Sequence, residues 1–99
     1  MTISANILKT LTEITGEPRV ELAIREIIKD SVEHRIQKIE QGIKTLEIKY
    51  NMKFKEFDHN FHKEQIPDQY SYEIERDYLE WEGLETRLKK YQSLLGLLF

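Results

Sequence analysis

Apolar residues recur through most of the chain at intervals of three and four, the spacing that places side chains on one face of an α-helix. Residues 17–50 carry the longest run, whose steps alternate between four and three as in a heptad seam. This seam and its N-terminal extension comprise Ile24, Ile28, Val32, Ile36, Ile39, Ile43, Leu46 and Tyr50. A heptad seam needs an equally long apolar partner, so we predict one long helix that packs along another.

A second long helical pattern occupies residues 71–96, and its seam contains Tyr78, Trp81, Leu84 and Leu88. Ser71 can cap its first turn, and Glu73 and Glu75 suit the positive end of the helix dipole. Residues 65–70 contain a proline and separate the two long patterns, so we predict a loop there. The two long helices then fold back on each other as an antiparallel, coiled-coil-like hairpin.

Two shorter helices are predicted beside the long ones. Residues 1–16 form a short helix and a turn, because Gly16 favours the left-handed conformation in which helices commonly end. Asn51 is second only to Gly at such positions, so we predict that the long helix ends at Tyr50 and that a short helix spans residues 53–64.

The alternative is one continuous helix through Asn51, because the aromatic residues Tyr50, Phe54, Phe57 and Phe61 keep the 4-3-4 spacing. We favour the break at Asn51. Phe54 and Phe57 are then expected to close the core of the hairpin, whereas Phe61 can serve either the core or a partner.

Composition supports a single all-α domain over residues 1–99, because the chain has only four Gly and two Pro to make turns. A helical hairpin of this length has a thin core, so we expect a partner or a second copy, with a homodimer as the simplest assembly. The absence of Cys excludes disulfides, thiolate zinc sites and cysteine nucleophiles. No signal-peptide pattern opens the chain and no stretch approaches the ~20 apolar residues of a membrane span, so we expect a cytoplasmic location.

Acidic residues are concentrated between residues 68 and 85, where seven acids accompany one base, Arg76. Such a face would attract a basic protein and repel nucleic acid; the alternative is an ordinary solvated helix face. Tyr70 and Tyr72 lie among these acids, and aromatic rings beside charges are typical of binding surfaces. The candidate partner-binding residues are Phe61, Tyr70, Tyr72, Glu73, Glu75, Asp77, Glu80 and Glu82.

The residues that most resemble a metal site are Glu56 and His59, a Glu-x-x-His pair, with His62 three positions further on. Di-iron four-helix proteins need a second such pair and two more inward Glu residues, and the chain has no second Glu-x-x-His. It also lacks HExxH, a phosphate-binding Gly loop and a nucleophile elbow. We therefore predict no catalytic residue, no metal and no cofactor, and we expect both histidines to be exposed.

The C-terminal stretch SLLGLLF, residues 93–99, is strongly apolar. We expect it to pack over the N-terminal helix or a second subunit; left exposed, it would act as a docking segment.

Residues 11–36, LTEITGEPRVELAIREIIKDSVEHRI, resemble the two helices of ribbon-helix-helix proteins. The resemblance implies helix-mediated dimerisation. In that family a preceding β-strand enters the DNA major groove, and here only MTIS precedes the first helix. DNA is therefore a weaker candidate partner, and a ribbon-helix-helix-like transcriptional repressor is retained as an alternative.

Residues 46–90 are similar to a group of small prokaryotic proteins with a K-Y-(G/N)-M-x-F-x-x-F block, an I-P-D loop and a Y-x-x-E-x-D-Y-x-E-W-E-x-L run. The matches include Lys49, Tyr50, Asn51, Met52, Phe54, Phe57, Ile66, Pro67, Asp68, Tyr72, Glu75, Asp77, Tyr78, Glu80, Trp81, Glu82 and Leu84. Members of this group often resemble the antitoxin half of a toxin–antitoxin pair whose toxin is a small ribonuclease. The resemblance thus implies a non-catalytic antitoxin whose partner is a basic toxin, with a structural coiled-coil scaffold as the main alternative.

Overall fold

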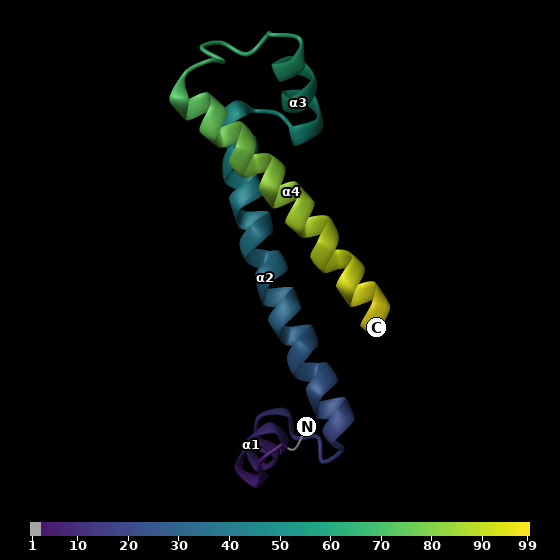
Figure 1. Ribbon diagram of the computed structural model, residues 1–99. Helices are drawn as coiled ribbons and strands as arrows, with labels where there is room; N and C mark the ends of the chain where they lie inside the picture. Colours follow the sequence, from purple (N-terminus) through teal and green to yellow (C-terminus); the bar gives the residue numbers. More distant parts are fainter. Residues whose placement is uncertain (1–2) are drawn as a thin grey trace.

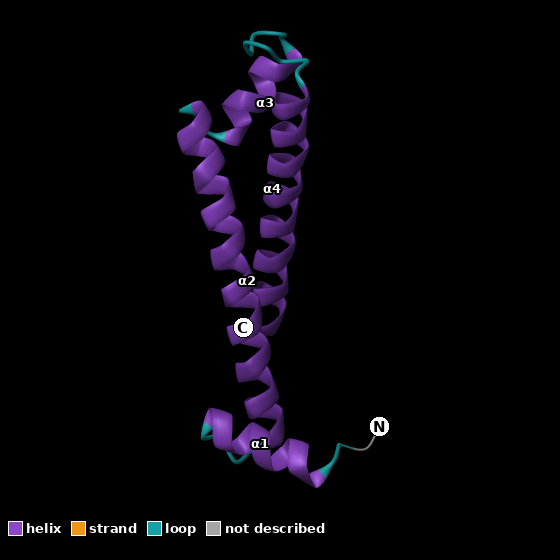
Figure 2. Ribbon diagram, turned by 90° about the vertical axis from the view of Figure 1, so that its left-hand side faces the viewer, coloured by secondary structure: helices purple, strands orange, loops and turns teal. Residues whose placement is uncertain are grey.

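The computed structural model describes residues 3–99, which form four α-helices (Figure 1). Helix α1 spans Ala5–Thr15, α2 spans Val20–Tyr50, α3 spans Phe54–His62 and α4 spans Tyr72–Leu98. No strand occurs among the residues described (Figure 2). The predicted all-α class, with a short, a long, a short and a long helix in this order, is confirmed.

Helices α2 and α4 run antiparallel and pack against each other as the predicted hairpin (Figure 1). The buried side chains come from the two heptad seams and include Val32, Ile39, Ile43, Leu46, Trp81 and Leu84. Ile36 and Leu88 are half-buried along the same faces. The seam of α2 is therefore occupied by α4 of the same chain.

Aromatic rings fill the closed end of the hairpin, where α3 folds over α2 and α4. Phe57 and Trp81 are completely buried, with ring centroids 5.1 Å apart. Tyr50 lies 4.6 Å from Phe57, and Phe54 lies 5.5 Å from Trp81. Such distances are typical of favourable aromatic pairs. The expectation that Phe54 and Phe57 close the core is confirmed.

The predicted helix ends are also present. Asn51 ends α2 in the left-handed conformation, with φ 54° and ψ 43°, and its backbone N–H donates to Glu47. Gly16 ends α1 in the same conformation, with φ 69°. The hydroxyl of Ser71 accepts the backbone N–H of Ile74 at the start of α4. The break at Asn51 is thus confirmed.

Helix α2 begins at Val20, later than the predicted residue 17. The carboxylate of Glu17 accepts the backbone N–H of Arg19 at 3.0 Å and its guanidinium N–H at 2.8 Å. These bonds hold Arg19 in an extended conformation, so that the first helical residue is the next one. They also lower the pKa of Glu17 to about 2.

The molecule is elongated, with extents of 58 × 25 × 23 Å and a radius of gyration of 19.5 Å. A compact chain of this length has a radius of gyration of about 13 Å. Helix α4 crosses α2 at an angle and stops well short of α1 (Figures 1 and 2). The expected packing of the C-terminal stretch on the N-terminal helix is therefore absent: Leu97 is exposed, and Phe99 lies near Lys29 of α2.

Candidate partner-binding surface

The loop between α3 and α4 is held in place by a buried glutamine. The side-chain amide of Gln69 donates to the carbonyl oxygen of Phe61 at 2.7 Å and accepts the backbone N–H of Ile66 at 3.4 Å. Ile66 is itself buried in the core of the hairpin. Glu64 and Asp68 both have a φ of 55°, which turns the backbone sharply before and after this isoleucine. The loop is thus a fixed support for the side chains around it.

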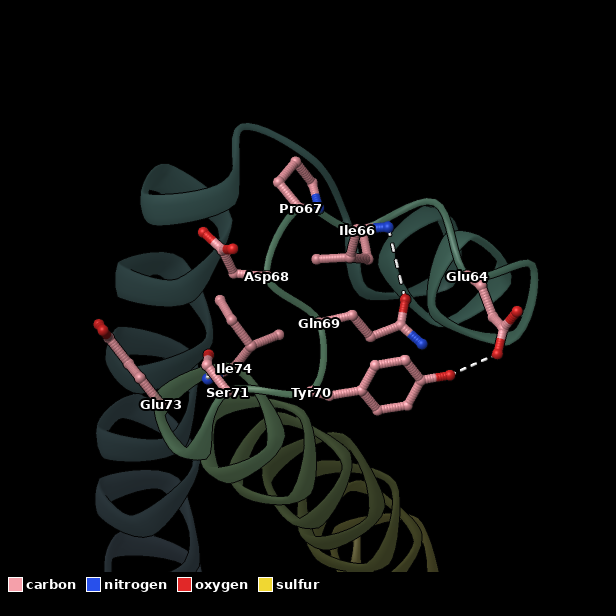
Figure 3. A pocket seen from close by; sticks show the side chains of 9 residues that line it. All are labelled: Glu64, Ile66, Pro67, Asp68, Gln69, Tyr70, Ser71, Glu73 and Ile74. Atoms are coloured by element: carbon pink, nitrogen blue, oxygen red, sulfur yellow. Dashed lines mark hydrogen bonds between the residues drawn. The ribbon is translucent and has the colours of Figure 1, made fainter.

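A groove of about 660 Å³ opens along this loop and the start of α4 (Figure 3). Its lining consists of Glu64, Ile66, Pro67, Asp68, Gln69, Tyr70, Ser71, Glu73 and Ile74. The Tyr70 ring extends toward Glu64 and its hydroxyl donates to that carboxylate, while Asp68 and Glu73 lie on the other side (Figure 3). None of these lining residues is basic. The groove therefore suits a positively charged side chain.

The outer face of α4 continues this surface. Tyr72, Glu75, Leu79 and Glu82 follow one another at intervals of three and four, so they share one side of the helix. All four are exposed, and Tyr72 and Leu79 are 79% and 66% accessible. The guanidinium of Arg76 lies 5.8 Å from the centre of the Tyr72 ring. Exposed aromatic and aliphatic groups between carboxylates form a surface that can bind a basic protein.

Two further predicted acids lie on a neighbouring side of α4. Glu73 accepts a hydrogen bond from the Lys49 ammonium of α2 at 2.6 Å and remains exposed. Glu80 is exposed as well. The predicted partner-binding residues that the fold leaves accessible are Tyr70, Tyr72, Glu73, Glu75, Glu80 and Glu82. We call these six residues, together with Leu79, the acidic surface.

Asp77 was predicted to belong to this surface, and that prediction is wrong because only 3% of Asp77 is exposed. Lys49 Nζ and the Tyr50 hydroxyl both donate to Asp77 Oδ2 at 2.5 Å. Burial opposes the ionisation of Asp77, but the bonds from Lys49 and Tyr50 outweigh it and lower the pKa of this carboxyl. Asp77 occupies a seam position four residues before Trp81, so it joins α4 to α2.

The hydrogen bonds to Asp77 also shift the pKa values of their donors, Lys49 and Tyr50. The hydrogen bond to Asp77 raises the pKa of Lys49, with a second contribution from Glu73. Burial raises the pKa of Tyr50 to about 12, and its bond to Asp77 adds to this effect. Lys49, Tyr50 and Asp77 therefore form a charged and hydrogen-bonded link across the hairpin.

Phe61, predicted to contact either the core or a partner, packs half-buried against the core. Its ring stacks on that of Tyr78, with centroids 4.3 Å apart. The Tyr78 hydroxyl in turn donates to Asp58 at 2.5 Å. Phe61 thus extends the aromatic cluster of the closed end and presents little of its ring to a partner.

The histidines of α3 are exposed, as expected. His62 Nδ1 lies 2.8 Å from the carbonyl oxygen of Asp58 and 3.2 Å from its carboxylate. Among residues 3–99 no group of three or more His, Cys, Asp or Glu side chains is arranged to hold a metal ion.

Within the described part of the chain, no helix is both long enough and apolar enough to cross a membrane.

Sequence reasoning missed three residues that shape this surface. Leu79 could have been recognised, because it is an apolar residue half a turn away from the seam of α4. Lys49 and Gln69 carried no such signal, since their partners are tertiary: Lys49 binds Asp77, 28 positions away, and Gln69 binds the end of α3.

These observations define an all-α chain, a two-helix hairpin whose closed end presents acidic and aromatic side chains. A family model matches residues 1–98, and the chain belongs to the Uncharacterized protein MJ0235 family. No curated protein and no solved structure matches the chain.

Proposed function

We propose that the chain is a non-catalytic binding module that captures a basic protein on the acidic surface, as an antitoxin does when it neutralises a small ribonuclease-type toxin. The observation that carries this proposal is the exposure of Tyr70 and Tyr72 beside an acidic groove on a firmly held loop. Exposed tyrosines on a rigid support lose little conformational entropy when a partner covers them.

Charge supports a basic partner. Between residues 68 and 85, six acids remain after Asp77 is set aside, against the single base Arg76. Such a concentration of one sign accelerates encounter with an oppositely charged protein and suppresses binding to like-charged molecules. Nucleic acid is among the molecules that it repels.

A ribonuclease fits this description because it must carry Lys and Arg side chains where the RNA phosphates bind. A protein that fills that site with tyrosines and carboxylates blocks the substrate without any chemistry of its own. The similarity of residues 46–90 to antitoxin-like proteins supports the same partner class.

Co-expression with the product of the adjacent reading frame tests the proposal. We expect relief of that product's toxicity and a stable complex in size-exclusion chromatography. A neighbour that is harmless alone and elutes separately from this chain would contradict the antitoxin function.

Matched variants test the surface itself. The double substitution Tyr70→Ala and Tyr72→Ala should weaken the complex about 10-fold or more, because interface tyrosines are frequent hot spots. The control is Ile48→Ala, which alters a 71% exposed side chain of α2 outside the acidic surface and should leave binding unchanged. Unchanged binding by the double variant would favour the structural coiled-coil scaffold.

A further inference from the structure

Gln69 lines the groove beside Tyr70, yet only 6% of Gln69 is exposed. A partner that covers Tyr70 can therefore touch little of the glutamine side chain. A buried amide is unfavourable unless its polar atoms are hydrogen-bonded. Both ends of the Gln69 amide are bonded within the chain, so its role lies in what these bonds hold in place.

The two partners of the Gln69 amide determine its orientation. The carbonyl oxygen of Phe61 can only accept a hydrogen bond, and the backbone N–H of Ile66 can only donate one. The amide nitrogen therefore faces Phe61 at 2.7 Å. The amide oxygen faces Ile66 at 3.4 Å (Figure 3). An ionised glutamate of the same length would only accept, so the position requires an amide.

Phe61 gives the loop a firm attachment point. Its ring packs against the core of the hairpin and stacks on Tyr78, with centroids 4.3 Å apart. Its carbonyl oxygen also accepts the backbone N–H of Glu64 at 3.2 Å. The Gln69 amide thus joins the loop to a part of α3 that the aromatic core itself holds.

Tyr70 follows Gln69 directly, so its position depends on how the glutamine is held. The backbone N–H of Gln69 donates to the carbonyl oxygen of Ile66 at 3.2 Å, which closes a turn just before Tyr70. At the other end of the side chain, the Tyr70 hydroxyl donates to Glu64 (Figure 3). The Tyr70 ring is therefore held at both ends, although the residue is 69% exposed.

Tyr72 is held by a different part of the structure. It is the first residue of α4, which Ser71 caps by accepting the backbone N–H of Ile74. Its backbone therefore belongs to a helix and does not depend on the amide of Gln69. The two exposed tyrosines of the acidic surface provide an internal comparison.

We propose that Gln69 is a positioning residue for the basic partner: its amide fixes the Tyr70 ring in the orientation that the partner contacts. This inference rests on the proposed function and adds a buried determinant of affinity to it. A side chain that is mobile before binding loses conformational entropy when a partner covers it. Loss of the amide should therefore weaken the complex about 3- to 10-fold, through Tyr70 and not through Tyr72.

Nuclear magnetic resonance of the free chain tests the positioning without a partner. In Gln69→Met, which keeps the length of the side chain and removes the amide, we expect the nuclear Overhauser effects between the Tyr70 ring and Glu64 to disappear. Gln65→Met is the matched control, because it alters an exposed glutamine of the same loop and should preserve them. Fluorescence of Trp81, the only tryptophan, verifies that each variant retains a folded hairpin.

A second variant repeats this test with a smaller change. Gln69→Asn keeps the amide but is one methylene group too short to bond both Phe61 and Ile66, so the same loss is expected. A Tyr70 ring that keeps its contacts with Glu64 in both Gln69 variants would overturn the proposal.

Isothermal titration with the product of the adjacent reading frame tests the consequence for binding. Tyr70→Ala should cost less affinity in the Gln69→Met chain than in the wild type, whereas Tyr72→Ala should cost the same in both. An equal cost of Tyr70→Ala in the two chains would overturn the role of Gln69. A wild-type chain that binds nothing would contradict the proposed function, while the resonance measurement separately decides whether Gln69 fixes Tyr70.

Discussion

Asn51 separates α2 from α3 with a backbone conformation that most residues avoid. Its φ of 54° lies in the left-handed region, where a Cβ atom is crowded by the backbone. Asn is tolerated there because its short polar side chain can bond locally, and Gly is tolerated because it has no Cβ. The identity of this one residue therefore fixes where the long helix stops.

We predict that Asn51→Ala lowers the free energy of unfolding by about 1 kcal/mol, the cost of placing an ordinary side chain in this conformation. Asn51→Gly should leave stability close to that of the wild type. Urea unfolding followed by circular dichroism measures both. Equal stability of the Ala and Gly variants would mean that the bend does not require the left-handed conformation.

Tyr50, one residue earlier, makes the free energy of unfolding of the chain depend on pH. Its pKa is raised to about 12 in the folded chain, whereas the phenol of an unfolded chain titrates near pH 10. The unfolded state therefore loses its proton first, and the stabilisation present below pH 10 is lost as the pH rises toward 12. Burial and the bond to Asp77 likewise hold the folded phenol in its neutral form.

We predict that the free energy of unfolding falls between pH 9 and pH 11, and that Tyr50→Phe reduces the size of this fall. Guanidinium unfolding at the two pH values measures the difference. Tyr72→Phe is the control, because Tyr72 is 79% exposed in the folded chain. An identical decline in wild type and Tyr50→Phe would contradict the assignment.

At the scale of elements, the hairpin follows from side-chain spacing. The seam of α2 was predictable because heptad periodicity directs Val32, Ile39 and Leu46 to one side wherever the helix lies. The burial of Asp77 was predictable from the same spacing, because Asp77 lies four residues before Trp81. It was instead grouped with the exposed acids because it lies among them in the sequence. The angle at which α4 crosses α2 was not predictable, because crossing geometry depends on how individual side chains interlock.

Gly83 and Gly42 lie in the interiors of the two long helices and differ in their surroundings. A methyl group on Gly83 would meet only the mobile end of Arg87 at 3.5 Å, whereas one on Gly42 would lie 3.1 Å from Cδ1 of the buried Leu84. The second contact is tighter than ordinary van der Waals packing.

We predict that Gly83→Ala raises the free energy of unfolding by about 0.5–1 kcal/mol, through the loss of backbone freedom in the unfolded chain. Gly42→Ala should gain less, because Leu84 has to move. Thermal and urea unfolding compare the two variants. A gain from Gly42→Ala as large as that from Gly83→Ala would show that Leu84 adjusts without cost.

At the scale of the whole molecule, the acidic surface lies at one end of an elongated body whose longest extent is 58 Å. The acidic character of one end was predictable from the sequence. Which apolar residues stay exposed was not predictable, because that depends on where α4 stops and on the angle at which it crosses α2. Ile24 and Ile28 continue the seam of α2, yet Ile24 is half-buried and Ile28 is exposed.

The acidic surface is proposed to capture a basic protein. Isothermal titration of the wild-type chain with the product of the adjacent reading frame, at low and at physiological salt, tests it most directly. We predict saturable binding that weakens as salt rises and that falls about 10-fold or more in the Tyr70→Ala, Tyr72→Ala variant but not in Ile48→Ala. The absence of any heat of binding would contradict it. So would an affinity that changes neither with salt concentration nor with the substitution of the two tyrosines.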